Sequence, residues 1–179
     1  MATNATIFKV DLQIADLDRH YYQSHTLTIA RHPSETDERM MVRVLAFACL
    51  AHKDLSFGKG LSTDDEPDLW RKSMTDVIEQ WIEVGQPDEK RLRRAAGRSR
   101  QVYVFSYGGE AAEAWWQHHQ RKLKQMDKLV VYRVPEEASQ ALTGLVERTM
   151  QLQCTIQDGE FMFTNGERTV EIVLEKLKP

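Results

Sequence analysis

Cysteine is scarce in this sequence, and neither of its two cysteines stands in a metal-binding spacing. Cys49 falls within a helical pattern and Cys154 within a strand pattern, with no CxxC and no His/Cys pairing around either. We expect two buried, reduced thiols, which is typical of a cytosolic protein. The sequence therefore provides no evidence for a zinc site.

Long apolar runs are also missing. The longest, from Val44 to Ala51, is much shorter than a bilayer requires. The first residues lack the basic and apolar regions of a signal peptide. We therefore expect a cytoplasmic protein that makes no contact with a membrane.

Repeats, low-complexity tracts, a P-loop, a GxGxxG fingerprint and a nucleophilic triad are absent as well. The 179 residues, 41% of them hydrophobic and 28% charged, predict one globular domain over residues 1–179. The net charge of −3 excludes a polycation, yet six basic residues and no acid lie between Lys90 and Arg100. A local basic patch matters more for binding phosphates than the net charge does.

Apolar spacing along the chain predicts alternating strands and helices. An N-terminal hairpin is predicted over 7–14 and 21–30, followed by a helix from a Ser34 cap to about Ala51 and a loop over 57–66. A second hairpin, 68–73 and 78–85, precedes a basic helix from Pro87 to about Gly97. The rest alternates, in chain order: strand 101–107, helix 110–126, strand 129–134, helix 135–148, and antiparallel strands 150–156, 160–164 and 168–177. The predicted fold class is α/β, with one mixed central sheet flanked by helices.

Two carboxylates stand on facing strands of the second hairpin. Asp68 starts one strand and Glu83 lies near the end of the other, so their side chains can approach each other. Neighbouring like charges need a cation, a proton or a basic neighbour to compensate them, and oxygen ligands suit Mg²⁺ or Mn²⁺. A solvated hairpin surface, with Asp68 capping a turn and Glu83 paired with an arginine, is the alternative interpretation. The pattern alone leaves both open.

The hairpin also carries a resemblance to known proteins. Pro67-Asp68, a hairpin-length gap and Glu83 at the end of an apolar strand resemble the core motif of the PD-(D/E)xK phosphodiesterases, and the order of helices and strands resembles their restriction-endonuclease-like fold. More specifically, Glu-Pro-Asp-Leu-Trp (66–70) and Trp-Ile-Glu-Val-Gly-Gln-Pro-Asp-Glu-Lys-Arg-Leu-Arg (81–93) resemble the bacterial YaeQ family, over the whole chain. The resemblance implies Mg²⁺ or Mn²⁺ held by Asp68, Glu83 and the backbone carbonyl of Val84.

The motif lysine should stand two residues beyond Glu83, where this chain has Gly85. In enzymes of this kind the lysine orients the attacking water and stabilises developing charge. Gln86, the next residue, or Lys90, in the first turn of the following helix, is expected to replace it.

Further residues are expected to assist. Glu38, in the first turn of the first long helix, takes the place of an additional acid, although the helix dipole by itself favours an acid there. Arg93, Arg94 and Arg98 recur at helical spacing and are expected to contact phosphates, whereas Arg91 should point elsewhere.

Two functional hypotheses follow. The first is a divalent-metal-dependent phosphodiesterase acting on nucleic acid. The second is a non-catalytic regulatory protein that holds nucleic acid or a protein partner. The resemblance links the YaeQ family in general terms to transcription elongation, which makes a transcription-related protein a candidate partner. Gly85 and the acidic net charge favour the second hypothesis, and the two acids with the adjacent basic helix favour the first.

Overall fold

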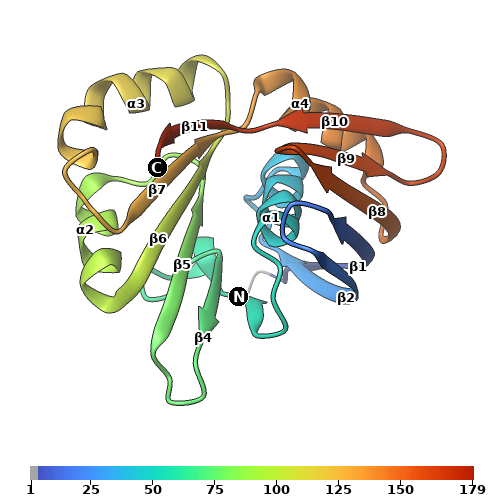
Figure 1. Cartoon of the computed structure of the whole chain (residues 1–179), viewed down its shortest axis with the longest axis horizontal. Coiled ribbons are helices and arrows are strands. Elements are labelled where there is room, and N and C mark those ends of the chain that lie inside the picture. Colours follow the sequence, from blue (N-terminus) through green and yellow to red (C-terminus); the bar gives the residue numbers. More distant parts are fainter. Residues whose placement is uncertain (1–3) are drawn as a thin grey trace.

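The strands form two sheets. The computed structural model describes residues 4–179, and in Figure 1 the two sheets stand side by side with one helix between them. Each sheet combines parallel and antiparallel neighbours, so the mixed α/β class is confirmed. The prediction of a single central sheet was wrong, because alternation along a strand does not reveal which sheet the strand joins.

The N-terminal hairpin and the C-terminal strands build the five-stranded sheet. Its strands, in spatial order, are β10 (Thr169–Val173), β9 (Glu160–Thr164), β8 (Thr149–Gln157), β1 (Thr6–Asp16) and β2 (Tyr21–Arg31). Along β8 buried and exposed side chains alternate without interruption, so one face of this sheet is packed and the other faces solvent.

The middle of the chain builds the six-stranded sheet, joined by the last strand. Its order is β11 (Glu175–Lys178), β7 (Leu129–Arg133), β6 (Ser99–Ser106), β5 (Ile78–Val84), β4 (Leu69–Lys72) and β3 (Leu55–Phe57). The strand expected over 168–177 is therefore two strands in different sheets. Lys178, the last residue of β11, is buried, and its ammonium group donates a hydrogen bond to the carbonyl of Leu129 on β7, 2.9 Å away.

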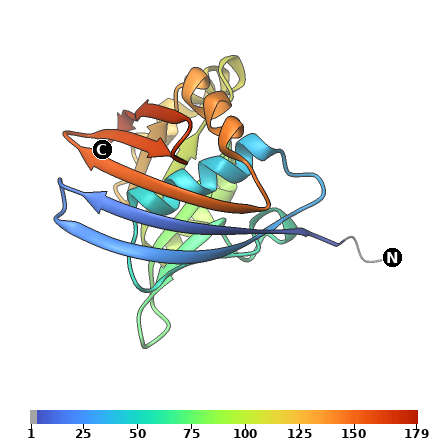
Figure 2. The same ribbon diagram turned by 90° about the vertical axis from the view of Figure 1, so that its right-hand side faces the viewer.

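Helices fill both sides of the six-stranded sheet. Helix α1 (Asp37–Cys49) lies between the two sheets, with α4 (Glu136–Leu142) and the 3-10 turn Thr143–Leu145 beside it. Figure 2 shows α1 behind the strands of the five-stranded sheet. Helices α2 (Glu89–Arg98) and α3 (Glu110–Leu123) cover the opposite face. The helix expected over 135–148 is thus shorter than predicted.

Strand β5 separates the two cores and so positions the site. Ile82 and Val84 pack into the core around α1, whereas Trp81 packs into the core under α2 and α3. Helix α1 begins at Asp37 and is capped by Thr36, not by Ser34, because the Thr36 hydroxyl accepts a hydrogen bond from the backbone of Arg39 at 3.1 Å. Within residues 4–179 no helix is long and apolar enough to span a membrane.

Candidate metal and phosphate site

A pocket of about 340 Å³ opens where the β4–β5 hairpin meets α2. Leu69 pairs with Ile82, so Asp68, immediately before β4, lies beside Glu83 at the end of β5. Four of the predicted residues line this pocket: Asp68, Glu83, Val84 and Gln86. Two arginines, Arg39 from α1 and Arg91 from α2, also line it.

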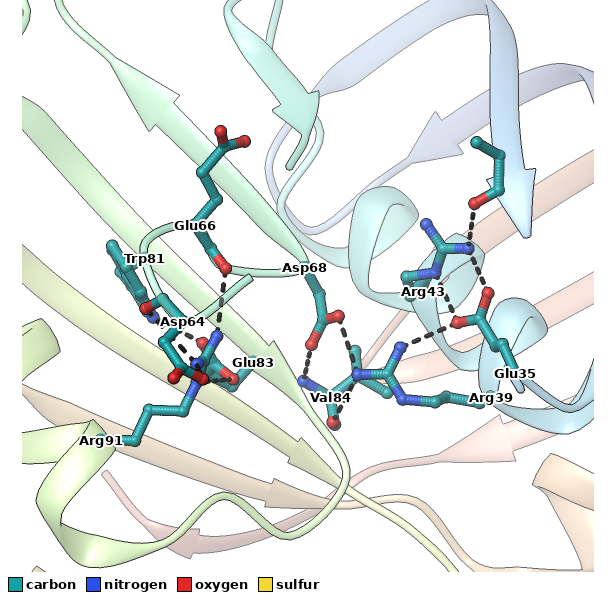
Figure 3. Close-up of polar contacts among 11 residues, drawn as sticks. Glu35, Arg39, Arg43, Asp64, Glu66, Asp68, Trp81, Glu83, Val84 and Arg91 are labelled. Carbon is teal, nitrogen blue, oxygen red and sulfur yellow. Dashed lines mark hydrogen bonds and ion pairs between the residues drawn. The ribbon is translucent and has the colours of Figure 1, made fainter. Parts of the chain in front are cut away.

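The carboxylate of Asp68 is buried and held on both oxygens. Its Oδ2 accepts from the backbone N–H of Val84 at 2.8 Å, and its Oδ1 accepts from Nη2 of Arg39 at 2.8 Å. The same arginine nitrogen donates to the carbonyl oxygen of Val84 at 3.3 Å. Figure 3 shows this ring of contacts. Asp68 and Val84 therefore present two oxygens to one positively charged nitrogen.

The carboxylate of Glu83 is held by different partners. Its Oε2 accepts from the indole of Trp81 at 2.7 Å, and its Oε1 accepts from Nε of Arg91 at 2.9 Å (Figure 3). Burial raises the pKa of Glu83, and the nearby charge of Asp68 adds to that rise, against the opposing hydrogen bonds from Arg91 and Trp81. Glu83 is thus an acid whose negative charge needs a cation beside it.

A buried glutamate holds Arg39 in place. Glu35 accepts from Nη1 of Arg39 at 2.8 Å, and it also accepts from Nη2 and Nε of Arg43 at 2.6 and 3.0 Å. Burial disfavours the charge on Arg39, but the carboxylates of Asp68 and Glu35 outweigh it and raise the pKa of the guanidinium. Arg39 therefore stays protonated beside the pocket.

Two predicted residues lie away from the pocket lining. Glu38 accepts a hydrogen bond from Ser139 on α4, at 2.7 Å, and so binds the neighbouring helix. Lys90 is exposed on α2. The cation that α2 sends into the pocket is Arg91, one position further along, because helix α2 begins at Glu89 and each residue turns the side chain by about 100°.

The three arginines expected to bind phosphate lie outside the pocket on α2. Arg93 pairs with Glu89 at 2.7 Å, and the guanidinium of Arg98 lies 5.3 Å from the ring centre of Trp81. Arg94 is exposed.

The backbone at the position of the motif lysine is specific to glycine. Gly85 has φ of +104°, a conformation that side-chain-bearing residues rarely adopt. An added β-carbon would meet only Tyr107, at an ordinary 3.9 Å, so space is available and the backbone is the obstacle. A lysine at this position would strain the chain.

The donors in the pocket suit a divalent cation. The oxygens of Asp68 and Val84 already converge on one cationic nitrogen, and Glu83 lines the same pocket. Among residues 4–179 no group of three or more His, Cys, Asp or Glu side chains forms a metal cluster. A cation here would rest on two carboxylates, a carbonyl and water, which is the ligand set that Mg²⁺ accepts.

Sequence reasoning missed Arg39 and Arg91. The sequence does contain a pattern that points to Arg39. Glu35, Arg39 and Arg43 follow one another at steps of four residues, which places an acid and two bases on one helical face. No sequence pattern points to Arg91, since the direction of its side chain depends on the residue at which α2 begins.

Comparison with known proteins gives matches over almost the whole chain. The model of the YaeQ protein family matches residues 1–174. The chain is 43% identical to the protein described as "Uncharacterized protein YaeQ" in Salmonella typhi and 42% identical to that of Escherichia coli strain K12, in each case over 97% of this chain and 96% of the relative. The crystal structure of YaeQ from Xanthomonas axonopodis pv. citri superposes with a TM-score of 0.94 at 46% identity, covering 97% of this chain and 98% of that one. The structure from Pseudomonas syringae gives 0.93 at 37% identity, covering 98% and 97%.

Proposed function

This chain belongs to the YaeQ family, and we propose that it is a divalent-metal-dependent phosphodiesterase acting on nucleic acid. One observation carries the proposal. Asp68 and the carbonyl of Val84 present oxygens to a single cationic nitrogen, in a pocket that Glu83 also lines. Two carboxylates and a carbonyl are hard oxygen donors, so Mg²⁺ or Mn²⁺ is the proposed cation.

The order of elements around the pocket supports a restriction-endonuclease-like core. Helix α1 is followed by the antiparallel meander β3–β4–β5, then by α2, and then by β6, which runs parallel to β5. The resemblance of the Pro67-Asp68 and Glu83 motif to the PD-(D/E)xK phosphodiesterases implies the same order.

In the proposed reaction Arg91 supplies the positive charge that the motif lysine would otherwise bring. Its Nε is fixed by Glu83, whereas its Nη1 makes only long contacts with Asp64, at 3.4 and 3.5 Å. The Asp64 side chain is 90% exposed, so little holds that nitrogen away from a phosphate oxygen. Nη2 donates to the carbonyl of Glu66 at 3.1 Å, so Nη1 is the nitrogen that would donate to a phosphate oxygen and stabilise the charge that develops on it.

The cation and the remaining side chains have separate roles. A bound Mg²⁺ or Mn²⁺ would polarise a phosphoryl oxygen and lower the pKa of a coordinated water. Gln86 lies at the pocket, and its amide donates to the backbone carbonyl of Tyr107. As a residue of the pocket lining, Gln86 would orient the attacking water. Arg93, Arg94 and Arg98 would hold the nucleic-acid backbone along α2.

Cleavage assays on single- and double-stranded DNA and RNA, with Mn²⁺, with Mg²⁺ or with a chelator, test the proposal. We expect metal-dependent cleavage that Glu83→Gln and Asp68→Asn abolish. Glu171→Gln, the same substitution at an exposed residue of β10 in the other sheet, is the matched control and should cleave normally. Wild-type protein that cleaves none of these substrates with either metal would contradict the proposal.

A second candidate function is non-catalytic binding of nucleic acid or of a transcription-related protein. It is favoured by the glycine backbone at position 85 and by the arginine that each carboxylate already has as a partner. In that case binding should persist in Glu83→Gln and weaken steeply with salt. Arg93→Glu with Arg94→Glu should reduce the slope of log affinity against log salt by about 2. No binding by wild type at low salt would exclude nucleic acid and leave a protein partner.

A further inference from the structure

We infer that Arg39 competes with the divalent cation for the same oxygens, so that metal enters the pocket only when the guanidinium of Arg39 swings out. The inference rests on the proposed metal site and adds a regulatory element to it. Arg39 comes from α1, outside the hairpin that carries the proposed ligands. Occupancy of the proposed metal site would therefore depend on the position of one side chain from α1.

The competition follows from shared atoms. Nη2 of Arg39 lies 2.8 Å from Oδ1 of Asp68 and 3.3 Å from the carbonyl oxygen of Val84. These two oxygens belong to the residues proposed as metal ligands. A cation coordinated at 2.0–2.6 Å, the range for Mg²⁺ and larger hard cations, would have to take the place of that nitrogen.

Charge leads to the same conclusion. With Arg39 in place, the carboxylates of Asp68 and Glu83 are balanced by the guanidinium groups of Arg39 and Arg91. A divalent cation added to this neutral set would leave two positive charges in excess inside a partly buried pocket. Removal of Arg39 halves that excess, so metal binding and the inward position of Arg39 oppose each other.

Arg39 has a place to go and leaves no buried charge unpaired behind it. It also lines a second, adjoining pocket of about 450 Å³, together with Glu66 and Lys59. When Arg39 leaves, Glu35 keeps both hydrogen bonds from Arg43. The side chain of Arg39 is 14% exposed and that of Arg43 only 6%, so Arg39 is the more accessible partner of the two. Metal would in turn replace Arg39 as the partner of Asp68.

Calorimetric titration of Mn²⁺ into the full chain tests the inference without relying on catalysis. We expect Arg39→Gln to lower the dissociation constant for Mn²⁺ by about tenfold or more, since close buried charge pairs are typically coupled by at least this factor. Arg121→Gln, the same change at an exposed arginine of α3 outside the pocket, should leave the constant unchanged. Asp68→Asn added to Arg39→Gln should abolish the tight binding and so locate it.

A second measurement uses wild-type protein, in case Arg39→Gln folds poorly. Labelling of arginine by phenylglyoxal, followed by peptide mass spectrometry, should be faster at Arg39 when Mn²⁺ is present. The rate at the exposed Arg121 serves as the internal reference and should not change with metal.

The outcomes separate the two claims. If wild type and Arg39→Gln bind Mn²⁺ equally, or if Mn²⁺ leaves the labelling of Arg39 unchanged while it binds, the competition is refuted and the metal site stands. If neither protein binds Mn²⁺ at millimolar concentration, the metal site and the competition are both refuted.

Discussion

Replacing Glu35 by glutamine should be among the most destabilising single changes near the site. Glu35 lies just before α1 with its side chain 1% exposed, and it accepts three hydrogen bonds from Arg39 and Arg43. Glutamine keeps the shape but removes the charge, and its amide places donors against arginine donors. With the amide oxygen in the place of Oε2, Nη2 of Arg43 would face the amide nitrogen and keep only its bond to the carbonyl of Ala30, at 3.3 Å.

The magnitude follows from burial. Breaking a buried ion pair by removing one partner costs about 3–5 kcal/mol of unfolding free energy. In a chain of this length each kcal/mol shifts the melting temperature by about 2–4 °C, which gives a loss of roughly 6–20 °C. Urea unfolding followed by tryptophan fluorescence measures the free energy, and an unchanged m-value would show that the unfolded states are comparable.

The matched control is Glu175→Gln. Glu175 also binds one arginine through two nitrogens, Arg133 at 2.7 and 2.9 Å, but its side chain is 55% exposed. An exposed pair of this kind contributes about 0–1 kcal/mol. If Glu35→Gln costs no more than Glu175→Gln, burial does not decide the strength of this network and the reasoning is refuted.

Two further predictions concern backbone strain and pH. Gly85→Ala should lower the unfolding free energy by about 1–3 kcal/mol because of the positive φ at that position, whereas Gly97→Ala, within α2 and with open space around it, should leave it unchanged or slightly raised; equal effects in urea unfolding would contradict the assignment. Burial raises the pKa of Cys49 from its ordinary value of 9.0 to about 12, so in alkali the unfolded chain loses this proton first. The stabilisation is complete below pH 9 and is lost as pH rises toward 12, and Cys49→Ala should make the fall of unfolding free energy with pH shallower by about 1.4 kcal/mol per unit; an unchanged slope would show that the fold does not raise the pKa of this thiol.

Many local features follow from the sequence because short-range sterics determine them. The alternating strand pattern located most of the strands, and Asp158-Gly159 forms the expected tight turn, with φ of 52° and 74°. The sequence does not predict the three-residue strand β3 and places only Phe57 of it, in a loop, because so short a run carries no period. The facing positions of Asp68 and Glu83 were readable from the hairpin, whose register also follows from local pairing.

Tertiary structure alone decided how these elements combine into sheets and into a site. Strands β10 and β11 share one continuous sequence pattern but join different sheets, because the partner strands lie far away in the chain. Arg39 reaches Asp68 across 29 positions, and Arg91 reaches Glu83 because α2 begins at Glu89. The sequence by itself therefore determined which two carboxylates line one pocket, since they belong to one hairpin. The arginines that pair with these carboxylates come from α1 and α2, and their identity depended on how these helices pack against the hairpin. Side-chain periodicity carries no information about such long-range packing.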